Sequence, residues 1–281
     1  MKILVTGGAG FVGVNLIKKL LKDQHNVVSV DNYSIGTETN HIEGALYHDL
    51  DVNSIAKLTN DFDLIFHLAG LSRIQPSFLQ PTQTFQANAC GVEAVLEWAR
   101  PNKTKIIYSG SSSKHHNPYQ SPYAFYKYLG EEMCRMYRKT YTMPIEIVRF
   151  YNVYGPSEIT EGDWAAVIGL WRHQANHGGP ITIVGDGKQK RDFTHIEDIV
   201  DGLIRIAFSE ETEKLAWELG SGKNYTLLKV YELFRQRFGV GKVHLDDQQG
   251  NYRETLREDN AALDKLGWKP QDRLPDYIEN L

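Results

Sequence analysis

The sequence predicts an α/β fold in which a doubly wound parallel sheet is joined by a smaller C-terminal domain. Two observations lead to this prediction. Short β-rich runs alternate with helical patterns through the first half of the chain, and a glycine-rich loop lies between the first run and the first helical pattern. Alternating strands and helices form a parallel sheet that is covered on both faces and binds ligands at the carboxyl ends of its strands.

Five strands and three helices are expected in the first half of the chain. The strands are expected at Lys2–Thr6, Asn26–Val30, Asp63–Leu68, Lys105–Ser109 and Glu146–Phe150. The helices are expected at Phe11–Lys22, Thr82–Arg100 and Tyr123–Thr140. The second half is less regular, with short strands between glycine-rich turns and helices near His195–Phe208 and Leu227–Phe238. Because no repeat or linker-like segment divides the chain, the second domain is expected to pack on the first and to exchange segments with it.

Composition indicates a globular protein and argues against several classes of partner. Of the 281 residues, 41% are hydrophobic and 23% are charged, which argues against disorder. The net charge of −4 provides no positive field for nucleic acid or a membrane surface, and no apolar run is long enough to span a membrane. Cys90 and Cys134 fit neither a metal site nor a disulfide framework, so no metal is expected. Met1 and Lys2 lead into the first strand without a signal-peptide pattern, so the cytoplasm is the expected location.

The glycine loop predicts a dinucleotide site. Gly7, Gly10 and Gly13 have the spacing Gly-x-x-Gly-x-x-Gly between a predicted strand and a predicted helix. Such glycines allow a tight turn, let the backbone approach a pyrophosphate, and let the helix pack closely on the strand. Asp31 ends the next strand, 18 residues after Gly13. A carboxylate there accepts hydrogen bonds from ribose hydroxyls and repels a 2′-phosphate, so the loop predicts a Rossmann-type site for NAD. The alternative is a tight structural turn beside a solvent-facing Asp31.

A tyrosine and a lysine on one helical turn suggest the chemistry. Tyr123 and Lys127 are four residues apart, so both lie on one face of the helix that Pro122 begins. A nearby ammonium and a cationic nicotinamide should lower the pKa of the Tyr123 phenol toward a value useful for proton transfer. Ser111 follows a strand and is expected to share a substrate proton with Tyr123. The alternative is a solvated helix face, because this spacing is common by itself.

Many ordered motifs then indicate a family. The sequence resembles the extended short-chain dehydrogenase/reductase family, in particular its NAD-dependent sugar-nucleotide epimerases and dehydratases. The resemblance covers nearly the whole chain and rests on the segments Thr6–Gly13, Asp31–Gly36, His67–Leu71, Asn88 with Gly91, Tyr123 with Lys127, Arg149–Pro156, Gly185–Phe193, Gly220–Gly222 and Leu266–Pro270.

The resemblance implies contacts to the cofactor, in addition to those of the three loop glycines, Tyr123 and Lys127. The implied residues are Phe11 and Val12 at the pyrophosphate, Asp31, Asn32, Tyr33, Ser34 and Gly36 at the adenosine ribose, Asp49 and Leu50 at the adenine, Leu68, Ala69, Gly70 and Ser72 along the path to the nicotinamide, and Asn88 and Tyr151 beside the cofactor.

The resemblance also implies residues for the sugar nucleotide. Ser111 matches a substrate-binding position, and Asn152 and Arg191 match positions that hold the diphosphate, for which a guanidinium is suited because it can form two parallel hydrogen bonds. An ion pair of Arg191 with a neighbouring carboxylate is the alternative. Where the family has Arg-x-Gly-Asp, this chain has Gln248-Gln249-Gly250-Asn251, so Arg253 is considered as a replacement for the missing arginine.

The family reaction begins with oxidation of a sugar hydroxyl, and the groups near Ser111 decide the fate of the keto sugar. Similar dehydratases carry Asp-Glu directly after the catalytic hydroxyl residue, and similar decarboxylases carry a Glu two places after it. Ser112 and Ser113 occupy those positions here and cannot act as carboxylic acids. The sequence therefore favours a 4-epimerase acting on a UDP-sugar, with a UDP-hexose expected. A dehydratase, a decarboxylase, a reductase and a non-catalytic NAD-binding protein are the alternatives.

One departure from the family affects the sugar pocket. Only 11 residues separate Ser111 from Tyr123, fewer than in the family pattern, and the segment contains His115 and His116. The missing loop normally covers the sugar pocket, so an altered sugar preference is expected. The two histidines are interpreted as loop residues, because no carboxylate or cysteine stands at ligand spacing from them. Tyr126, where the family favours a small residue, also suggests a reshaped pocket or simply helix packing.

Domain limits and assembly complete the expectations. Residues 1–152, with a returning segment near 192–208, are expected to form the NAD-binding Rossmann domain, and residues 153–281 mainly a substrate-binding domain. Similar proteins form homodimers through two helices that correspond to Thr82–Arg100 and Tyr123–Thr140. A homodimer is therefore expected here as well. The apolar positions Val92, Val95, Leu96, Met133 and Met136 would serve either that interface or the core.

Overall fold

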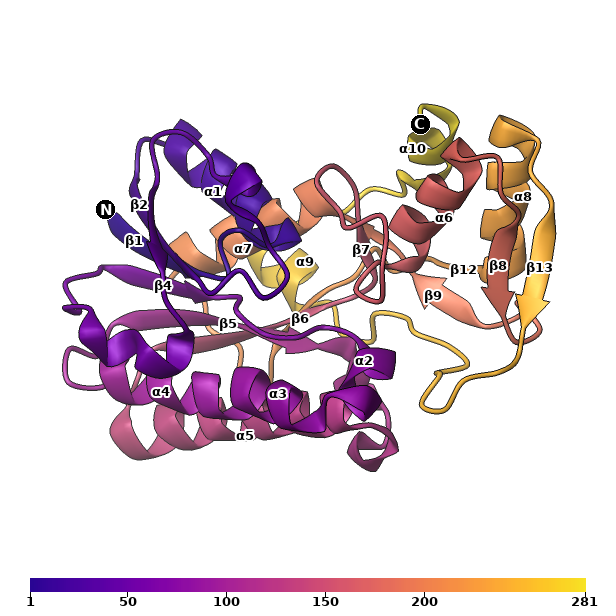
Figure 1. Cartoon of the computed structure of the whole chain (residues 1–281). Coiled ribbons are helices and arrows are strands. Elements are labelled where there is room, and N and C mark those ends of the chain that lie inside the picture. The colour runs from indigo at the N-terminus through magenta and orange to yellow at the C-terminus, as the bar shows by residue number, and fades with distance from the viewer.

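A seven-stranded parallel sheet forms the larger part of the molecule, as the sequence predicts (Figure 1). The computed structural model describes residues 1–281. The strand order is β11-β6-β5-β4-β1-β2-β3, in which the direction of winding reverses between β1 and β4, as in a doubly wound Rossmann sheet. The strands are β1 (Lys2–Thr6), β2 (Asn26–Asp31), β3 (Leu46–Asp49), β4 (Leu64–His67), β5 (Lys105–Ser111), β6 (Ile145–Phe150) and β11 (Trp217–Leu219).

All five predicted strands of the first half are confirmed, with ends that differ by no more than two residues, whereas β3 and β11 are additions. β3 has the sequence Leu-Tyr-His-Asp and shows no buried residue, so it lacks the apolar alternation that marks a strand. β11 consists of three buried residues, and Trp217 pairs in parallel with Val148 of β6. Three residues are too few for a periodic signal, and their place at the sheet edge depends on tertiary packing.

Helices cover both faces of the sheet (Figure 1). On one face, α1 (Phe11–Lys22) and α7 (Ile196–Phe208) pack against each other over a core that also contains Trp217 and Trp268. On the other face, α4 (Gly91–Ala99) and α5 (Pro122–Tyr141) cover a second core. The short helices α2 (Ile74–Leu79), α3 (Pro81–Phe85) and α9 (Ala261–Leu266) complete these layers. No helix has the combined length and hydropathy needed to cross a membrane.

The predicted helix at Thr82–Arg100 is not a regular α-helix. A π-helical turn at Gln86–Cys90 separates α3 from α4. This turn contains the buried Asn88, whose amide donates to the Leu71 carbonyl and accepts from the Leu71 N–H, each at 2.8 Å. The irregular turn thus places Asn88 against the loop that follows β4. π-helical turns of this kind occur frequently at functional sites, and sequence periodicity does not detect a single wide turn.

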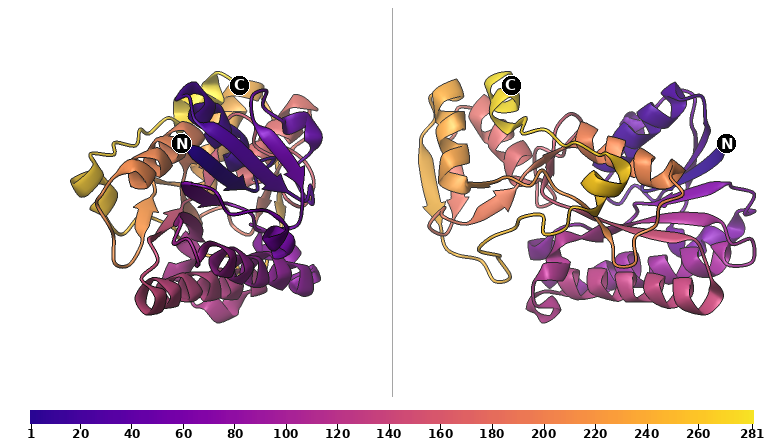
Figure 2. Two further views of the ribbon diagram at one scale, coloured as in Figure 1. Left: turned by 90° about the vertical axis from the view of Figure 1, so that its left-hand side faces the viewer. Right: turned by 180° about the vertical axis from the view of Figure 1, so that it is seen from behind.

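A third, smaller core is built from the C-terminal half (Figure 2). It contains α6 (Val167–Asn176), α8 (Leu227–Phe238) and α10 (Leu274–Glu279), which pack around the parallel pair β8 (Ile181–Val184) and β13 (Lys242–Leu245). Two further pairs, β7 (Val153–Tyr154) with β10 (Thr194–His195) and β9 (Lys190–Asp192) with β12 (Asn224–Thr226), connect the two parts. Short 3₁₀ turns lie at Glu38–Asn40, Val52–Lys57, Ser112–His115 and Pro118–Gln120.

Candidate active site

A cavity of about 1180 Å³ lies at the carboxyl ends of the sheet strands. The glycine loop forms one of its walls. Gly7 has a φ of +73°, and a Cβ there would lie 2.8 Å from the Ala69 nitrogen. A Cβ on Gly13 would lie 2.2 Å from the Gly7 carbonyl oxygen. The loop therefore has no room for side chains, which keeps the backbone open to a ligand.

The N-terminus of α1 begins in this loop, and it has features of a pyrophosphate site. Its N-cap is Gly10, which offers no side-chain cap, so the first backbone N–H groups of the helix remain available. Phe11 and Val12 follow in the first turn, and both line the cavity. Free N–H groups and the positive end of the helix dipole favour an anion at this place.

Asp31 connects the glycine loop to the segment after β2. Its carboxylate accepts hydrogen bonds from the N–H groups of Ala9 and Tyr33, each at 2.9 Å. Gly36 approaches so closely that a Cβ there would lie 2.5 Å from the Ala9 carbonyl oxygen. The carboxylate lines the cavity and still has acceptor capacity for ribose hydroxyls, so these residues fit a dinucleotide.

Most residues expected to bind the cofactor line this cavity, but four do not. Besides the loop glycines, Phe11, Val12, Asp31 and the two residues of the Tyr-Lys pair, the lining includes Asn32, Ser34, Gly36, Leu50, Leu68, Ala69, Gly70 and Ser72. Outside it are Tyr33, whose hydroxyl bonds to His41 at 2.8 Å, Asp49 on the edge strand β3, Asn88 behind the wall, and Tyr151, whose hydroxyl donates to Glu218 at 2.8 Å.

Ser111, Tyr123 and Lys127 meet in the same cavity. The Tyr123 hydroxyl donates to the Ser111 Oγ at 3.1 Å. The Lys127 ammonium donates to the Ser109 carbonyl oxygen at 2.9 Å. The start of α5 fixes this arrangement, because Ser121 caps the helix by accepting from the Ala124 N–H at 3.1 Å and Pro122 occupies the first turn. The three residues are thus held at the carboxyl end of β5.

Burial controls the titration of both groups. It raises the pKa of Tyr123, while the hydrogen bond from Tyr123 to Ser111 and the positive charge of Arg73 act in the opposite direction. In the protein without NAD, loss of solvent outweighs the nearby positive charge, so the lowered pKa that is expected beside a cationic nicotinamide stays a prediction. Burial also lowers the pKa of Lys127 to about 8.

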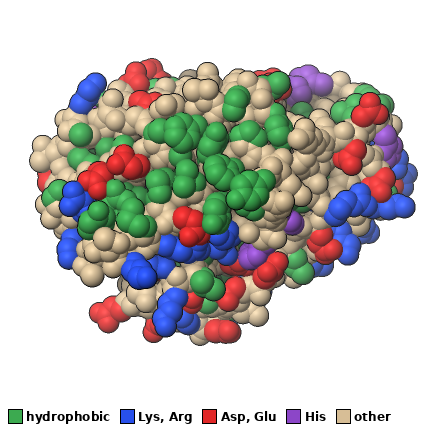
Figure 3. All heavy atoms as spheres, turned by 90° about the horizontal axis from the view of Figure 1, so that it is seen from below, with side chains coloured by type: hydrophobic (Ala, Val, Ile, Leu, Met, Phe, Trp, Pro, Cys, Tyr) green, Lys and Arg blue, Asp and Glu red, His purple; other side chains and the backbone are tan.

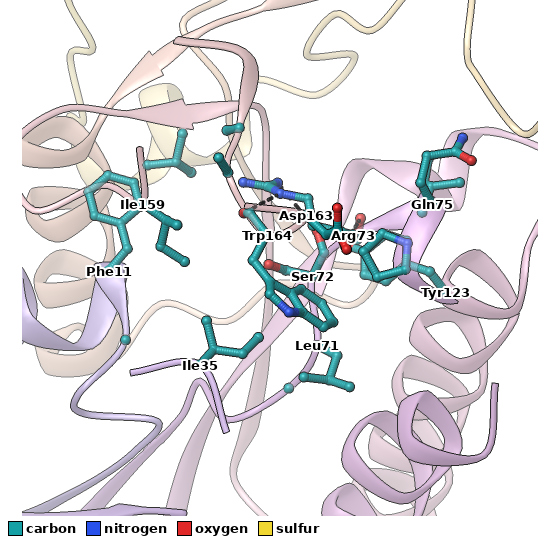
Figure 4. Close-up of a pocket in the computed structure, with 18 of the residues that line it drawn as sticks. Phe11, Ile35, Leu71, Ser72, Arg73, Gln75, Tyr123, Ile159, Asp163 and Trp164 are labelled. Atoms are coloured by element: carbon teal, nitrogen blue, oxygen red, sulfur yellow. Dashed lines mark hydrogen bonds between the residues drawn. The ribbon is translucent and has the colours of Figure 1, made fainter. Parts of the chain in front are cut away.

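Arg73 is a second cation beside Tyr123 that the sequence did not indicate. It lies in the loop between β4 and α2, and its Nε donates to the Trp164 carbonyl oxygen at 2.9 Å. Figure 4 shows Arg73 near the centre of the cavity, with Phe11 on one side and Tyr123 on the other. The only sequence signal was a single arginine six residues after the end of a buried strand, near the edge where parallel sheets bind ligands.

The diphosphate candidates are divided between two places. The guanidinium of Arg191 lines the cavity, donates to Asn251 Oδ1 at 3.2 Å, and has no carboxylate within 4.0 Å, so the alternative of an ion pair is absent. Burial lowers the pKa of Arg191 to about 10. Asn152 also lines the cavity, and its amide donates to Thr255 Oγ1 at 2.9 Å. Arg253 lies outside, where its exposed guanidinium pairs with Asp186 at 3.2 Å.

Two buried hydroxyl groups have no partner in the cavity wall. The Ser113 Oγ and the Tyr252 hydroxyl both line the cavity without a hydrogen-bond partner within 3.5 Å, and the weak interaction with Ser113 acts against the rise that burial causes in the pKa of Tyr252. Leaving such groups unpaired costs about 1–3 kcal/mol each, so a polar ligand is expected to satisfy them. The ring of Tyr252 stacks on His116, with 3.9 Å between ring centroids. The C-terminal loop thus contacts the shortened Ser111–Tyr123 segment.

His115 has a structural role in an ion-pair network. Its Nε2 lies 2.5 Å from Glu218 Oε1, and the same oxygen accepts from Arg149 at 3.2 Å. No group of three or more histidine, cysteine or carboxylate side chains is arranged to hold a metal ion. The hydrogen bond with Glu218 raises the pKa of His115 above its usual value, although burial acts in the opposite direction. In turn, the hydrogen bond with His115 helps to lower the pKa of Glu218 to about 2, against the effect of burial.

We expect His115→Gln to remove a pH-dependent part of the stability. Because the pKa of His115 is higher in the folded protein, the stabilisation is fully present below the unfolded value of about 6.5 and is lost as pH rises through the folded value. The free energy of unfolding, measured with urea, should therefore differ more between wild type and variant near pH 6 than near pH 9. The exposed His177→Gln is the control. A difference that stays constant or grows with pH would contradict the assignment.

The comparisons with known proteins agree with this geometry. The family model described as the NAD dependent epimerase/dehydratase family matches residues 3–220. An uncharacterized UDP-glucose epimerase of Bacillus subtilis is 29% identical, over 100% of this chain and 96% of that protein. A UDP-N-acetyl-alpha-D-glucosaminuronate decarboxylase of Bacillus cytotoxicus is 31% identical, over 84% of this chain and 79% of its own length. The structure of the UDP-glucuronic acid 4-epimerase of Bacillus cereus, in complex with UDP-glucuronic acid and NAD, has a TM-score of 0.89 and 28% identity, covering 99% of this chain and 97% of that one.

Proposed function

Because the chain belongs to the NAD dependent epimerase/dehydratase family, we propose that it is a UDP-sugar 4-epimerase whose sugar is a hexose or a derivative of one. The observation that carries the proposal is the Tyr123–Ser111 pair, joined by a hydrogen bond of 3.1 Å at the cavity wall. It provides a group for proton transfer, and the residues after Ser111 are serines that add no carboxylic acid. Epimerisation needs no acid or base other than the group that removes the proton of the sugar hydroxyl and later returns it.

NAD is the cofactor of this family, and the cavity fits it. The glycine loop and the start of α1 would hold the pyrophosphate, and Asp31 would hold the adenosine ribose. Position 70 has no room for a side chain, because a Cβ on Gly70 would lie 2.8 Å from Asn88 Oδ1 and 3.4 Å from the Lys127 nitrogen. When bound, NAD supplies the oxidation and the later reduction of the sugar carbon.

The residues of this chain move the proton. Tyr123 takes the proton of the sugar C4 hydroxyl as that carbon is oxidised, and returns it to the C4 oxygen on reduction from the other face. Ser111 lies within hydrogen-bond distance of the Tyr123 hydroxyl and orients it toward the same oxygen. Lys127 lies one helical turn after Tyr123 on α5, and we propose that its ammonium stabilises the phenolate of Tyr123. In the diphosphate subsite, Asn152 and Arg191 orient the UDP group.

Four carboxylates line the cavity, and two of them, Glu158 and Asp163, lie away from the segments implied for the adenosine. Asp31 and Asp51 lie with the segments implied for the adenosine. Glu158 accepts from the Tyr277 hydroxyl at 3.2 Å and lies 4.0 Å from Arg172, and Asp163 is exposed. None of these carboxylates is adjacent to Ser111 in sequence, as elimination of water or loss of carbon dioxide requires in similar enzymes. This placement of the carboxylates favours epimerisation, in which the keto sugar rotates and is reduced again, over dehydration and decarboxylation.

A product assay on a panel of nucleotide sugars tests this proposal. We expect an unchanged mass with a new retention time on anion exchange, with NAD retained by the purified protein because the cofactor is regenerated in each turnover. Loss of 18 or 44 mass units (about one water or one carbon dioxide) would contradict epimerisation and favour a dehydratase or a decarboxylase. Net oxidation of added NADH would favour a reductase. An absence of turnover on every donor would favour a non-catalytic NAD-binding protein.

A cytoplasmic homodimer is the form that we propose for the enzyme. Figure 3 shows hydrophobic side chains gathered on the face that carries α3, α4 and α5. Phe85, Met136 and Tyr141 are exposed there by 38%, 45% and 38%. Of the five apolar positions considered for an interface, Val92, Val95 and Leu96 are buried in the core and Met133 packs against it partly buried, so only Met136 is fully on the surface.

A further inference from the structure

Arg73 is a cation of the active-site cavity that forms no ion pair, and the one carboxylate that acts on it, Glu158, lies more than 4.0 Å away. Its Nε donates to the Trp164 carbonyl oxygen at 2.9 Å and its Nη1 donates to the Ser72 carbonyl oxygen at 3.4 Å. Both acceptors are neutral, the Nη2 group makes no hydrogen bond, and no carboxylate lies within 4.0 Å of the guanidinium. By contrast, the buried Arg149 pairs with the carboxylates of both Glu131 and Glu218.

The surroundings offset only part of the cost of a charge at Arg73, through the phenol of Tyr123 and the carboxylate of Glu158. Burial lowers the pKa of Arg73, which means that the surroundings disfavour its charged form. Holding the Trp164 loop requires one hydrogen-bond donor, and a neutral side chain would provide it. A guanidinium with a free Nη2 in a ligand cavity therefore indicates that an anionic group of the ligand completes its hydrogen bonds.

The other anions of the proposed reaction already have their own sites. The N-terminus of α1 suits the pyrophosphate of NAD, and Arg191, on β9, suits the diphosphate of the sugar nucleotide. Arg73 comes from a different element, the loop after β4, and lies beside Tyr123, where the reacting carbon of the sugar must be. An anion at this place belongs to the sugar ring itself. A neutral hexose has none, whereas a hexuronic acid carries a carboxylate on C5, next to the reacting C4.

We propose that Arg73 binds the carboxylate of a hexuronic acid, so that the substrate is a UDP-linked uronic acid and not a neutral UDP-hexose. This inference rests on the proposed function, which places the sugar beside Tyr123. Arg73 is then the residue that selects the sugar. Its free Nη2, alone or together with Nη1, donates hydrogen bonds to the sugar carboxylate.

The test compares UDP-glucuronic acid with UDP-glucose, which differ only in the group at C6. For wild type, we expect kcat/KM to be higher for UDP-glucuronic acid. Arg73→Gln keeps a donor for the Trp164 carbonyl but removes the charge, and should lower kcat/KM for the uronic acid about 10- to 100-fold, as expected for loss of a hydrogen bond to a charged group. Its kcat/KM for UDP-glucose should change little. Arg73→Lys should keep part of the preference, and Arg235→Gln, an exposed residue of α8, is the control for loss of one positive charge.

The outcomes separate this inference from the proposed function. Wild type that epimerises UDP-glucose better than UDP-glucuronic acid overturns the role of Arg73 while the 4-epimerase stands. Equal losses on both sugars in Arg73→Gln, with a shifted pH profile of kcat, show that Arg73 acts on Tyr123 instead, and loss of bound NAD shows that it serves the cofactor. If no epimerisation occurs, calorimetry still decides: binding of UDP-glucuronic acid that Arg73→Gln weakens supports the carboxylate site, and unchanged binding refutes it.

Discussion

Tyr123→Phe is expected to abolish turnover and to leave NAD bound. The substitution removes only the hydroxyl that lies 3.1 Å from Ser111 Oγ, while the ring and the cap of α5 remain. A positioned acid or base contributes about 10²–10⁴ in rate, so kcat should fall by about that factor. The NAD content should stay near that of wild type, because the glycine loop and Asp31 are untouched. The measurements are epimer formation by anion exchange and the NAD released on denaturation.

Tyr141→Phe is the matched control, because it makes the same change at the exposed end of the same helix. It should retain full activity and full NAD content. If Tyr123→Phe retains more than about a tenth of wild-type kcat, proton transfer does not depend on the phenol. The activity of Ser111→Ala would then show whether the serine hydroxyl replaces it. Loss of NAD in Tyr123→Phe would instead show that the hydroxyl serves mainly to hold the cofactor.

Gly13→Ala is expected to produce protein without NAD. The added Cβ would lie 2.2 Å from the Gly7 carbonyl oxygen and 2.6 Å from the Gly8 Cα, and both are backbone atoms of the turn that would cradle the pyrophosphate. Because these atoms cannot rotate away as a side chain does, the loop or the helix must shift. Overpacking of this kind costs about 1–3 kcal/mol, and the shift also moves the N–H groups at the start of α1.

Gly241→Ala tests whether the effect is local. Its Cβ would meet no atom within 4 Å, so it should keep the stability, the NAD content and the activity of wild type. For Gly13→Ala, the NAD content of the purified protein, the midpoint of thermal unfolding and kcat should all fall, and excess NAD should not restore full activity. A variant that binds NAD as tightly as wild type would show that the glycine loop is not the pyrophosphate site.

The glycine loop and the Tyr-Lys pair could be predicted because their chemistry is local. Gly7, Gly10 and Gly13 form one turn, and Tyr123 and Lys127 lie on one turn of a helix, so spacing alone brings each set together. The order of the first strands follows in the same way from alternating periodicities. Spacing does not show whether burial or a nearby charge has the larger effect on the pKa of a side chain. That is why the rise in the pKa of Tyr123 in the protein without NAD could not be predicted.

The sugar side of the cavity depends on contacts between distant loops, and sequence patterns do not report those. Arg73 is positioned by the carbonyl of Trp164, and Tyr252 is positioned by the ring of His116, across separations of 91 and 136 residues. Arg253 was considered because it lies near a missing motif arginine. However, two residues of a loop can face opposite ways, and its guanidinium pairs with Asp186 outside the cavity. Side-chain direction in irregular segments requires the tertiary structure.

The late strand β11 has a consequence for synthesis on the ribosome. Six strands of the large sheet are complete once Phe150 has been made, but the face under α1 is covered by α7, Trp217 and Trp268. Until those residues emerge, a nascent chain exposes the apolar surface of that face and the open edge of β6. Nearly the whole polypeptide must therefore be translated before the first core closes, and we expect nascent chains that end near residue 200 to depend on chaperones.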